Sequence, residues 1–491
     1  MTLNEILGTM PNGTMLAVSD DEVAKHLREQ YLDNDAEKMR REAARMRIDL
    51  YHDRGEVQIN AMVDSIFKNE RVREMRKQFV ELASFQNLTR RIVREISTVY
   101  SEPAIRRVRS SPMNVAYRRL QRGMRLDRRL RLANQMINLC NDVVCWFDMV
   151  HGKPTLRVVT PDNFWAVAHP NDPTVLAALI FDRTPAAGAI VTEDTPCYLV
   201  VTDTERFCMT KLGHILPSTR EPIGLSRMPM VLVHRVEPTV SLLTPDPGKD
   251  IINAHMAIAL INTMMLKHQK SGTKQAVASG DLADMPIGQP MDEEHLLQAP
   301  EGVALSTLDL GADPDSYIKA GRSVIKQIAA NYGIPESVFD LSYQATSGFE
   351  IELKRTGLRE VRRDQIMDWR PVEQDLAEIM SESLAEHRHE LAFNTLGWSI
   401  DFGEVETPQE PHSRLVYWEK LRQMGLMNTE QMYLALNPEA EEEDAEEAIA
   451  NNAVVEARRV SLYRTLNISP STPADGSDSM EDGDEDEDST P

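Results

Sequence analysis

Apolar positions recur at helical spacing in two segments near the middle of the chain, residues 249–270 and 313–332. In the first segment they cover more than one stripe, which predicts a helix packed on several sides. Cationic residues lie in its last turn and Gly272 follows, as expected at a helix C-terminus. The second segment has Pro314 in its first turn and Gly333 just past its end. The sequence therefore predicts two helices, each about 30 Å long.

A helix-poor insert, residues 271–312, separates these two helices. It is rich in Gly and Pro and contains short apolar alternations at residues 275–278 and 303–305. Alternation with a period of two, bounded by Gly and Pro, is typical of strands and turns. We therefore expect a small strand-and-turn module at the end of a helical hairpin.

A polar stretch and a third, longer helix follow the hairpin. Ser, Thr, Gln and Gly cluster over residues 340–348, which predicts a loop. Ser347 can cap the next helix, whose pattern extends over residues 349–390. Pro371 lies inside this pattern and removes one backbone donor, so we expect the helix to kink or break just before it.

The regions flanking these elements differ in hydrophobic pattern. Residues 20–55, 60–100 and 411–436 have helical patterns. Between residues 131 and 248, short apolar or β-branched runs separated by Gly, Pro, Asn and Asp predict an antiparallel or mixed sheet. These runs are 143–150, 155–159, 175–181, 197–201, 206–211 and 230–234, with one further strand at 396–402. The predicted fold class is α+β, mainly α-helical.

Size and charge add two constraints. The 491 residues exceed one ordinary core, so we expect two or more structural regions. Most of the formal charge of −23 is local, because seven acids lie between residues 439 and 447 and nine between 475 and 488. Neither run contains Lys or Arg. Acid runs combined with Ser, Thr and Pro predict a disordered tail over residues 461–491.

One stretch, residues 90–131, has the opposite charge, with thirteen arginines and three acids. Two interpretations stay open, because a guanidinium binds carboxylate and phosphate alike. The first is a solvated helix face or an ion-pair surface between subunits, and the second is direct contact with phosphates. An apolar stripe favours the first, and it consists of Leu120, Met124, Leu132 and Met136.

The search for chemical motifs argues against an enzyme. The sequence contains no GxxxxGK[ST], HExxH, GxSxG or GxGxxG pattern. One cluster of histidines and carboxylates invites a metal interpretation, but its two histidines, at i and i+2, point to different faces of a helix. It comprises Glu386, His387, His389 and Glu390. The four cysteines form no CxxC pair, and we expect free thiols. We expect no catalytic residue, no metal and no cofactor.

From residue 331 to 359 the chain resembles the portal proteins of tailed bacteriophages, in the branch with a stem, clip, wing and crown. The run NYGIPESVF at 331–339 carries this resemblance together with the polar loop that follows it. So does SGFEIELKR at 347–355, which is similar to the motif that begins the long kinked helix of the family. The order of elements also agrees, over roughly residues 31–437.

The resemblance implies an assignment for the whole chain. The first part comprises an N-terminal segment at 1–30, partly flexible, and a wing at 31–248. The stem helices are 249–270 and 313–332, and the clip between them is 271–312. Residues 333–410 contain the tunnel loop, the long kinked helix and a returning wing strand, and they are followed by a helical crown at 411–460 and the acidic tail at 461–491.

The resemblance also implies which residues meet DNA. The tunnel loop would comprise Ser342, Tyr343, Gln344, Ala345, Thr346, Ser347 and Gly348, and the acidic crown Glu441, Glu442, Glu443, Asp444, Glu446 and Glu447. Lys267, Lys270 and Lys274 would form a basic girdle near the clip, with ordinary helix capping as the alternative. Such a channel would touch phosphates only weakly, which lets duplex DNA slide.

A portal protein would be a homododecamer at one capsid vertex of the virion, assembled in the host cytoplasm. Its implied partners are double-stranded DNA without sequence specificity, the terminase large subunit, a head-tail adaptor, and the major capsid and scaffolding proteins. No membrane is implied, because the first hairpin helix is too short and too interrupted by polar residues to span a bilayer. Two alternatives remain: a helical scaffolding or capsid-associated assembly protein without a DNA channel, and a metal-dependent nuclease, for which the sequence offers no clustered carboxylates.

Overall fold

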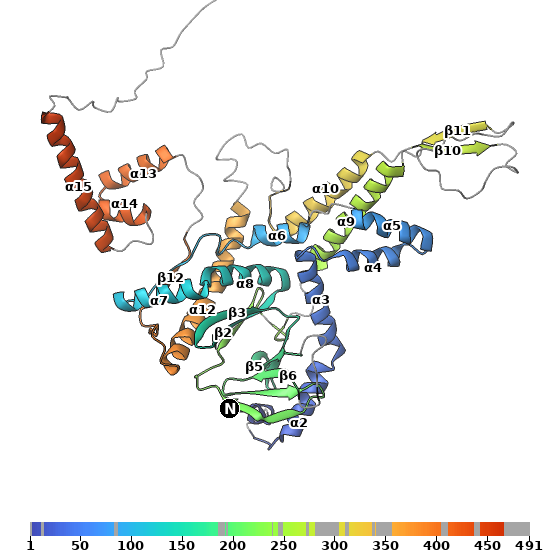
Figure 1. Cartoon of the computed structure of the whole chain (residues 1–491), viewed down its shortest axis with the longest axis horizontal. Helices are drawn as coiled ribbons and strands as arrows, with labels where there is room; N and C mark the ends of the chain where they lie inside the picture. Colours follow the sequence, from blue (N-terminus) through green and yellow to red (C-terminus); the bar gives the residue numbers. More distant parts are fainter. Residues whose placement is uncertain are drawn as a thin grey trace, which may run out of the picture. The chain divides into compact units, whose positions relative to one another are not determined.

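The computed structural model describes residues 2–10, 14–82, 87–184, 192, 195–237, 239–243, 249–271, 274–279, 304–309, 314–335, 339, 356–403, 411–436 and 442–465. The chain divides into two compact units, Met1–Val405 and Glu406–Pro491. The described elements are mainly helices with several small antiparallel sheets (Figure 1). The fold class is therefore α+β and mainly α-helical, as predicted.

Helices form the first part of the first unit, as the patterns of residues 20–55 and 60–100 predict. They are α1 (Leu3–Leu7), α2 (Asp20–Leu27), a π-helix η1 (Arg28–Leu32), α3 (Asp35–Tyr51), α4 (Glu56–Ile66), α5 (Glu70–Leu82), α6 (Leu88–Ile96), α7 (Ser111–Met124) and α8 (Leu126–Cys140). Arg125 separates α7 from α8 and adopts the left-handed conformation, with φ of 53°. This single residue turns the chain between two helices that are both rich in arginine.

The predicted sheet region forms two antiparallel sheets. Three strands in the order β3-β2-β9 form one and five in the order β4-β5-β6-β7-β8 the other. The strands are β2 (Asp142–Val150), β3 (Lys153–Val159), β4 (Phe164–His169), β5 (Asp172–Asp182), β6 (Pro196–Val201), β7 (Glu205–Thr210), β8 (Ile215–Pro222) and β9 (Met230–His234). The prediction missed β4 and β8. The strand expected at 396–402 is shorter, and β12 (Ser399–Asp401) pairs with β1 (Ile105–Arg107).

The helical hairpin and two strands in its insert are confirmed. α9 (Lys249–Ser271) and α10 (Pro314–Asn331) lie side by side, and β10 (Lys274–Ser279) and β11 (Ala304–Asp309) extend from their ends (Figure 1). The two strands pair antiparallel from Lys274 opposite Asp309 to Ser279 opposite Ala304. Gly333, predicted to follow the second helix, has φ of 63°, so it supplies the left-handed residue that ends α10.

The sequence predicted a kink or a break just before Pro371. The long helix α12 (Thr356–Glu386) continues through Pro371, so the predicted break is wrong, and the kink stays a prediction. Its buried face includes Trp369, Val372 and Leu376 and packs into the largest hydrophobic cluster, which holds both flanks of the proline in place. The helix ends at Glu386 rather than at residue 390, and Arg388 follows with φ of 47°. The predicted loop at 340–348 and the Ser347 cap lie outside the described residues.

The second unit contains α13 (Pro411–Gln423), α14 (Thr429–Leu436) and α15 (Glu442–Thr465), with α14 packed against α15. This agrees with the helical pattern expected there. α15 continues to Thr465, so its last five residues lie in the segment 461–491 that was predicted to be a disordered tail. The remainder of the tail lies outside the described residues. Across the described parts of both units, no helix is long and apolar enough to cross a membrane.

Candidate functional site

The base of the hairpin is packed on two sides. Ile251, Ala254 and Ile258 of α9 join a cluster with α6 and with Ile328 and Ala329 of α10. A second face of α9 packs against α3 and α4, through Ile252, Met256, Ala259, Leu50, Ile59 and Val63. The sequence predicted packing of this helix on several sides, and these two clusters confirm it. The hairpin is therefore firmly anchored at the end opposite its strands.

Polar contacts reinforce this anchor. Asp250 accepts hydrogen bonds from the Tyr332 hydroxyl at 3.1 Å and from the Asn331 amide at 3.3 Å, which ties the start of α9 to the end of α10. The guanidinium of Arg235 lies 5.4 Å from the centre of the Tyr332 ring. Burial and the nearby Asp250 carboxylate raise the pKa of Tyr332 to about 12, so its hydroxyl stays a donor.

His255 adds a titratable contact to the same base. The side chain is buried, and its Nδ1 lies 3.0 Å from Oγ1 of Thr89 on α6. Burial lowers the pKa of His255 below the ordinary value of 6.5, so the unfolded chain takes up a proton that the folded chain resists. We therefore expect the free energy of unfolding to decrease as the pH falls below 6.5.

Denaturant unfolding between neutral and mildly acidic pH measures this effect. The matched control is His255→Gln, which keeps a polar group near Thr89 and does not titrate. Burial also lowers the pKa of His26 and His52, but both are present in the two proteins and cancel in the comparison. The variant should lose less stability on acidification than the natural chain, and equal losses would contradict the role of His255.

Beyond its base, the hairpin leaves apolar side chains only partly covered. On α10, Ile318 is 44% exposed. On α9 the apolar residues between 260 and 266 are half-buried. We call these six residues the distal hairpin surface: Leu260, Ile261, Met264, Met265 and Leu266 of α9 and Ile318 of α10. Partly covered apolar side chains on a projecting helix pair are suited to packing against another protein surface.

The arginine-rich stretch divides into two groups. Some of its members have structural roles: Arg106 is buried beside Glu373, and Arg90 donates to the Tyr51 carbonyl oxygen at 2.9 Å. Others are exposed, and we call the six of these between residues 119 and 131 the arginine junction: Arg119, Arg122, Arg125, Arg128, Arg129 and Arg131. Within the part of the chain that the structure describes, none of the six forms an ion pair. The structural interpretation therefore holds for Arg106 and Arg90, and both interpretations stay open for the exposed arginines.

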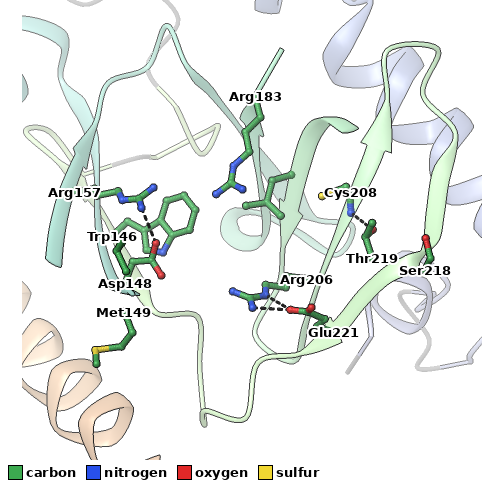
Figure 2. A pocket seen from close by; sticks show the side chains of 12 residues that line it. Trp146, Asp148, Met149, Arg157, Arg183, Arg206, Cys208, Ser218, Thr219 and Glu221 are labelled. Carbon is green, nitrogen blue, oxygen red and sulfur yellow. Dashed lines mark hydrogen bonds and ion pairs between the residues drawn. The ribbon is translucent and has the colours of Figure 1, made fainter. Parts of the chain in front are cut away.

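A pocket of about 650 Å³ opens between the two sheets (Figure 2). Trp146 and Leu199 are among the apolar lining residues. The charged lining residues include Arg157, Arg183 and Arg206 (Figure 2). The Arg157 and Arg183 guanidiniums lie 5.5 and 5.6 Å from the centre of the Trp146 ring.

Two of these three arginines are neutralised. Arg157 pairs with Asp148 at 3.0 Å and Arg206 with Glu221 at 2.6 Å. Cys208 also lines the pocket, but no histidine is among the lining residues. The pocket therefore offers one guanidinium, that of Arg183, beside an aromatic ring. This arrangement can hold a single anionic group, and it supplies no activated nucleophile.

No protein-family model and no curated protein matches the sequence. Solved structures that are similar to it at low identity include three from gene transfer agent particles. They are described as the virion of a native gene transfer agent (GTA) particle, the neck of an empty GTA particle computed with C6 symmetry, and the neck of a native GTA particle computed with C12 symmetry. The identities are 10%, 12% and 11%, each match covers 71% of this chain and 89%, 90% and 89% of the other, and each TM-score is 0.39. At this TM-score the likeness assigns neither a family nor a function.

The structure describes only some of the residues to which the resemblance assigns a role. The tunnel loop at 342–348 and Glu441 lie outside the described residues. Lys267 and Lys270 fall in the last turns of α9 and Lys274 begins β10, and only their backbone is described. Of the acidic crown, Glu446 and Glu447 are exposed on α15. Acids in the first turn of α15 also suit the positive end of its macrodipole, which is a purely structural role.

The histidine cluster at the end of α12 has local partners. Nδ1 of His387 lies 2.8 Å from the Ser383 carbonyl oxygen, and Nδ1 of His389 accepts from the Leu391 amide at 3.1 Å. No group of three potential metal ligands occurs among the residues that the structure covers. The cysteines are free thiols, and burial raises the pKa of Cys140 and Cys145 to about 12, which suppresses their reactivity.

Proposed function

We propose that the chain is a portal protein: a non-enzymatic, ring-forming conduit for duplex DNA at one vertex of a bacteriophage capsid. The helical hairpin carries the proposal. Its two helices are anchored at one end by apolar clusters on α3, α4 and α6 and end in a two-stranded insert. The YGIP turn and a long helix follow it in the chain, in the order that the resemblance implies.

A ring gives the distal hairpin surface a partner. In a single chain Ile318 and the apolar residues 260–266 of α9 stay partly open to water. When copies stand side by side around an axis, each hairpin covers part of this surface on its neighbour, and burial of apolar area favours association. Twelve copies follow from the portal resemblance, and the paired helices then enclose the channel.

The proposed channel holds DNA loosely. Duplex DNA carries about one charge per 1.7 Å of axis, so a strongly cationic wall would retain it. The polar loop at 342–348 and the acids of α15 would limit contact, while Lys267, Lys270 and Lys274 would form a modest girdle near the insert. The ring, located in the virion after assembly in the host cytoplasm, would dock the terminase large subunit during packaging and a head-tail adaptor afterwards. The capsid and scaffolding proteins would surround it.

Two measurements test this proposal. Negative-stain images and the native mass of the purified protein should show closed rings of about twelve copies. Shortening the loop by deleting residues 342–347 should leave the rings intact and reduce DNA packaging or retention in assembled heads. If the chain stays monomeric under every condition, and heads assembled without it still fill with DNA, the alternative of a helical assembly protein is supported. Loss of rings in the shortened variant would contradict the place of this loop in the channel.

A further inference from the structure

The arginine junction concentrates like charge in one short segment. Five of its six members follow one another at intervals of three residues through α7, the turn and α8: Arg119, Arg122, Arg125, Arg128 and Arg131. Side chains three or four residues apart on a helix are neighbours, and like charges at that spacing destabilise it. The junction therefore carries a self-repulsion that an anionic partner would relieve.

The apolar residues between these arginines hold the two helices on a firm base. Leu120, Met124, Leu126 and Leu130 are buried in the largest hydrophobic cluster, while the arginines beside them are exposed. The buried side fixes both helices against the core, so the opposite side presents the guanidiniums together. The backbone positions are therefore set before a partner arrives, and binding has to order only side chains.

No acid of the same segment neutralises the junction. The one acid between residues 119 and 131 is Asp127, which accepts from Nη1 of Arg106 at 2.7 Å. Arg106 is held in turn by Glu373. Asp127 is therefore already engaged by the core pair, and the segment keeps a strong net positive charge on its exposed side.

We propose that the arginine junction binds the phosphate backbone of duplex DNA, through residues other than those of the proposed channel loop. Duplex DNA carries about one negative charge per 1.7 Å of axis, so several guanidiniums in a row meet several phosphates at once. The planar guanidinium also donates a pair of hydrogen bonds that matches a phosphate group. The choice of a phosphate backbone rests on the arginines, and the choice of DNA among nucleic acids rests on the proposed function.

The composition of the exposed side favours DNA over an acidic protein surface. From residue 119 to 131 every exposed residue is an arginine except Gly123. Interfaces between proteins have an apolar core from which charged residues are depleted, whereas protein–DNA interfaces are more polar and much more positively charged. A strongly cationic surface also retains duplex DNA instead of letting it slide. The junction is therefore suited to holding a segment of DNA in place, which the proposed channel does not do.

Fluorescence anisotropy of a short labelled duplex, titrated with the full-length protein over a range of salt concentrations, tests the inference. The duplex should bind at low salt with an affinity that is independent of its base sequence, because phosphate contacts carry no sequence information. Replacing Arg119, Arg122 and Arg128 by Gln should weaken this binding at least about tenfold. The slope of log K against log salt should also fall by about 0.9 for each phosphate contact that is lost.

Two further variants serve as controls. The first replaces three exposed arginines on α3, α6 and α12, namely Arg45, Arg94 and Arg363, by Gln. It removes the same charge and should change the affinity by less than about twofold. The second is Arg125→Gly, which removes one guanidinium at a φ of 53° that glycine adopts without strain. It should keep the fold and reduce the salt slope by about 0.9, so the test stands even if the triple variant fails to fold.

Three results would overturn the inference. The first is no duplex binding at low salt. The second is equal weakening by the two triple sets of arginine substitutions. The third is a junction variant that keeps its affinity for the duplex but no longer assembles, which would assign the junction to the contact between copies. Native mass on the same samples reports ring formation separately. Rings without duplex binding therefore refute the junction alone, and duplex binding by a chain that forms no rings refutes the portal proposal alone.

Discussion

Glu373→Ala should destabilise the first unit by about 3–5 kcal/mol, because it leaves a buried guanidinium without its main counter-charge. The Glu373 side chain is 1% exposed and that of Arg106 fully buried. Arg106 donates to the two carboxylate oxygens at 2.6 and 2.9 Å, and the Tyr100 hydroxyl donates at 2.8 Å. Burial disfavours the charged guanidinium, but the Glu373 charge outweighs it and holds the pKa of Arg106 above its ordinary range.

Denaturant unfolding measures this loss. The pair Arg206 and Glu221 provides a control, because its side chains are 51% and 58% exposed, and Glu221→Ala there should change stability by less than about 1 kcal/mol. Replacing both buried partners, Arg106→Met with Glu373→Leu, should recover part of the stability, since no buried unpaired charge remains, although the buried Tyr100 hydroxyl loses its acceptor. A Glu373→Ala protein as stable as the surface variant would refute the assignment of this pair to the core.

Ile318→Asp should abolish ring formation while leaving the single chain folded. Ile318 is already 44% exposed, so within one copy the change affects no packed core. In the proposed ring the same position is covered by a neighbour, and an aspartate there would bury an unpaired carboxylate in every interface. Repetition around the ring multiplies this penalty. Native mass and circular dichroism of the variant should show folded monomers or small oligomers.

The control for this position is Ile318→Leu, which keeps an apolar side chain of similar volume and should keep the rings. Ser323→Asp adds the same charge to an exposed position of α10 and separates a general charge effect from a local one. Rings of normal size from Ile318→Asp would remove the distal hairpin surface from the subunit interface.

The hairpin is the part of the fold that the sequence predicts best. Its helices have strong end signals, such as Pro314 and Gly333, and its insert is set apart by composition. These are local features, and local patterns are sufficient to place them. The sequence predicts the strands of the sheets less completely. β4 follows Pro161 as a run of only six residues, and β8 contains two prolines and few apolar side chains. An edge strand such as β8 is defined by its neighbour β7 rather than by its own pattern.

Long-range pairing explains what the sequence left open at the candidate sites. Arg106 and Glu373 are 267 residues apart, and nothing in either local pattern indicates the other. For the same reason the thirteen arginines of residues 90–131 could not be divided in advance. Once the fold places Glu373 beside Arg106, that arginine becomes structural and the exposed ones of α7 and α8 become candidates for binding.

The hairpin is joined at both extremities, by Asp250 with Tyr332 at one and by the paired strands β10 and β11 at the other. Two packed helices that are linked at each end resist sliding past one another. A force applied to the strands is therefore transmitted lengthwise into α3, α4 and α6 instead of being absorbed by slippage of α9 along α10. We therefore expect the hairpin to behave as a stiff element under load.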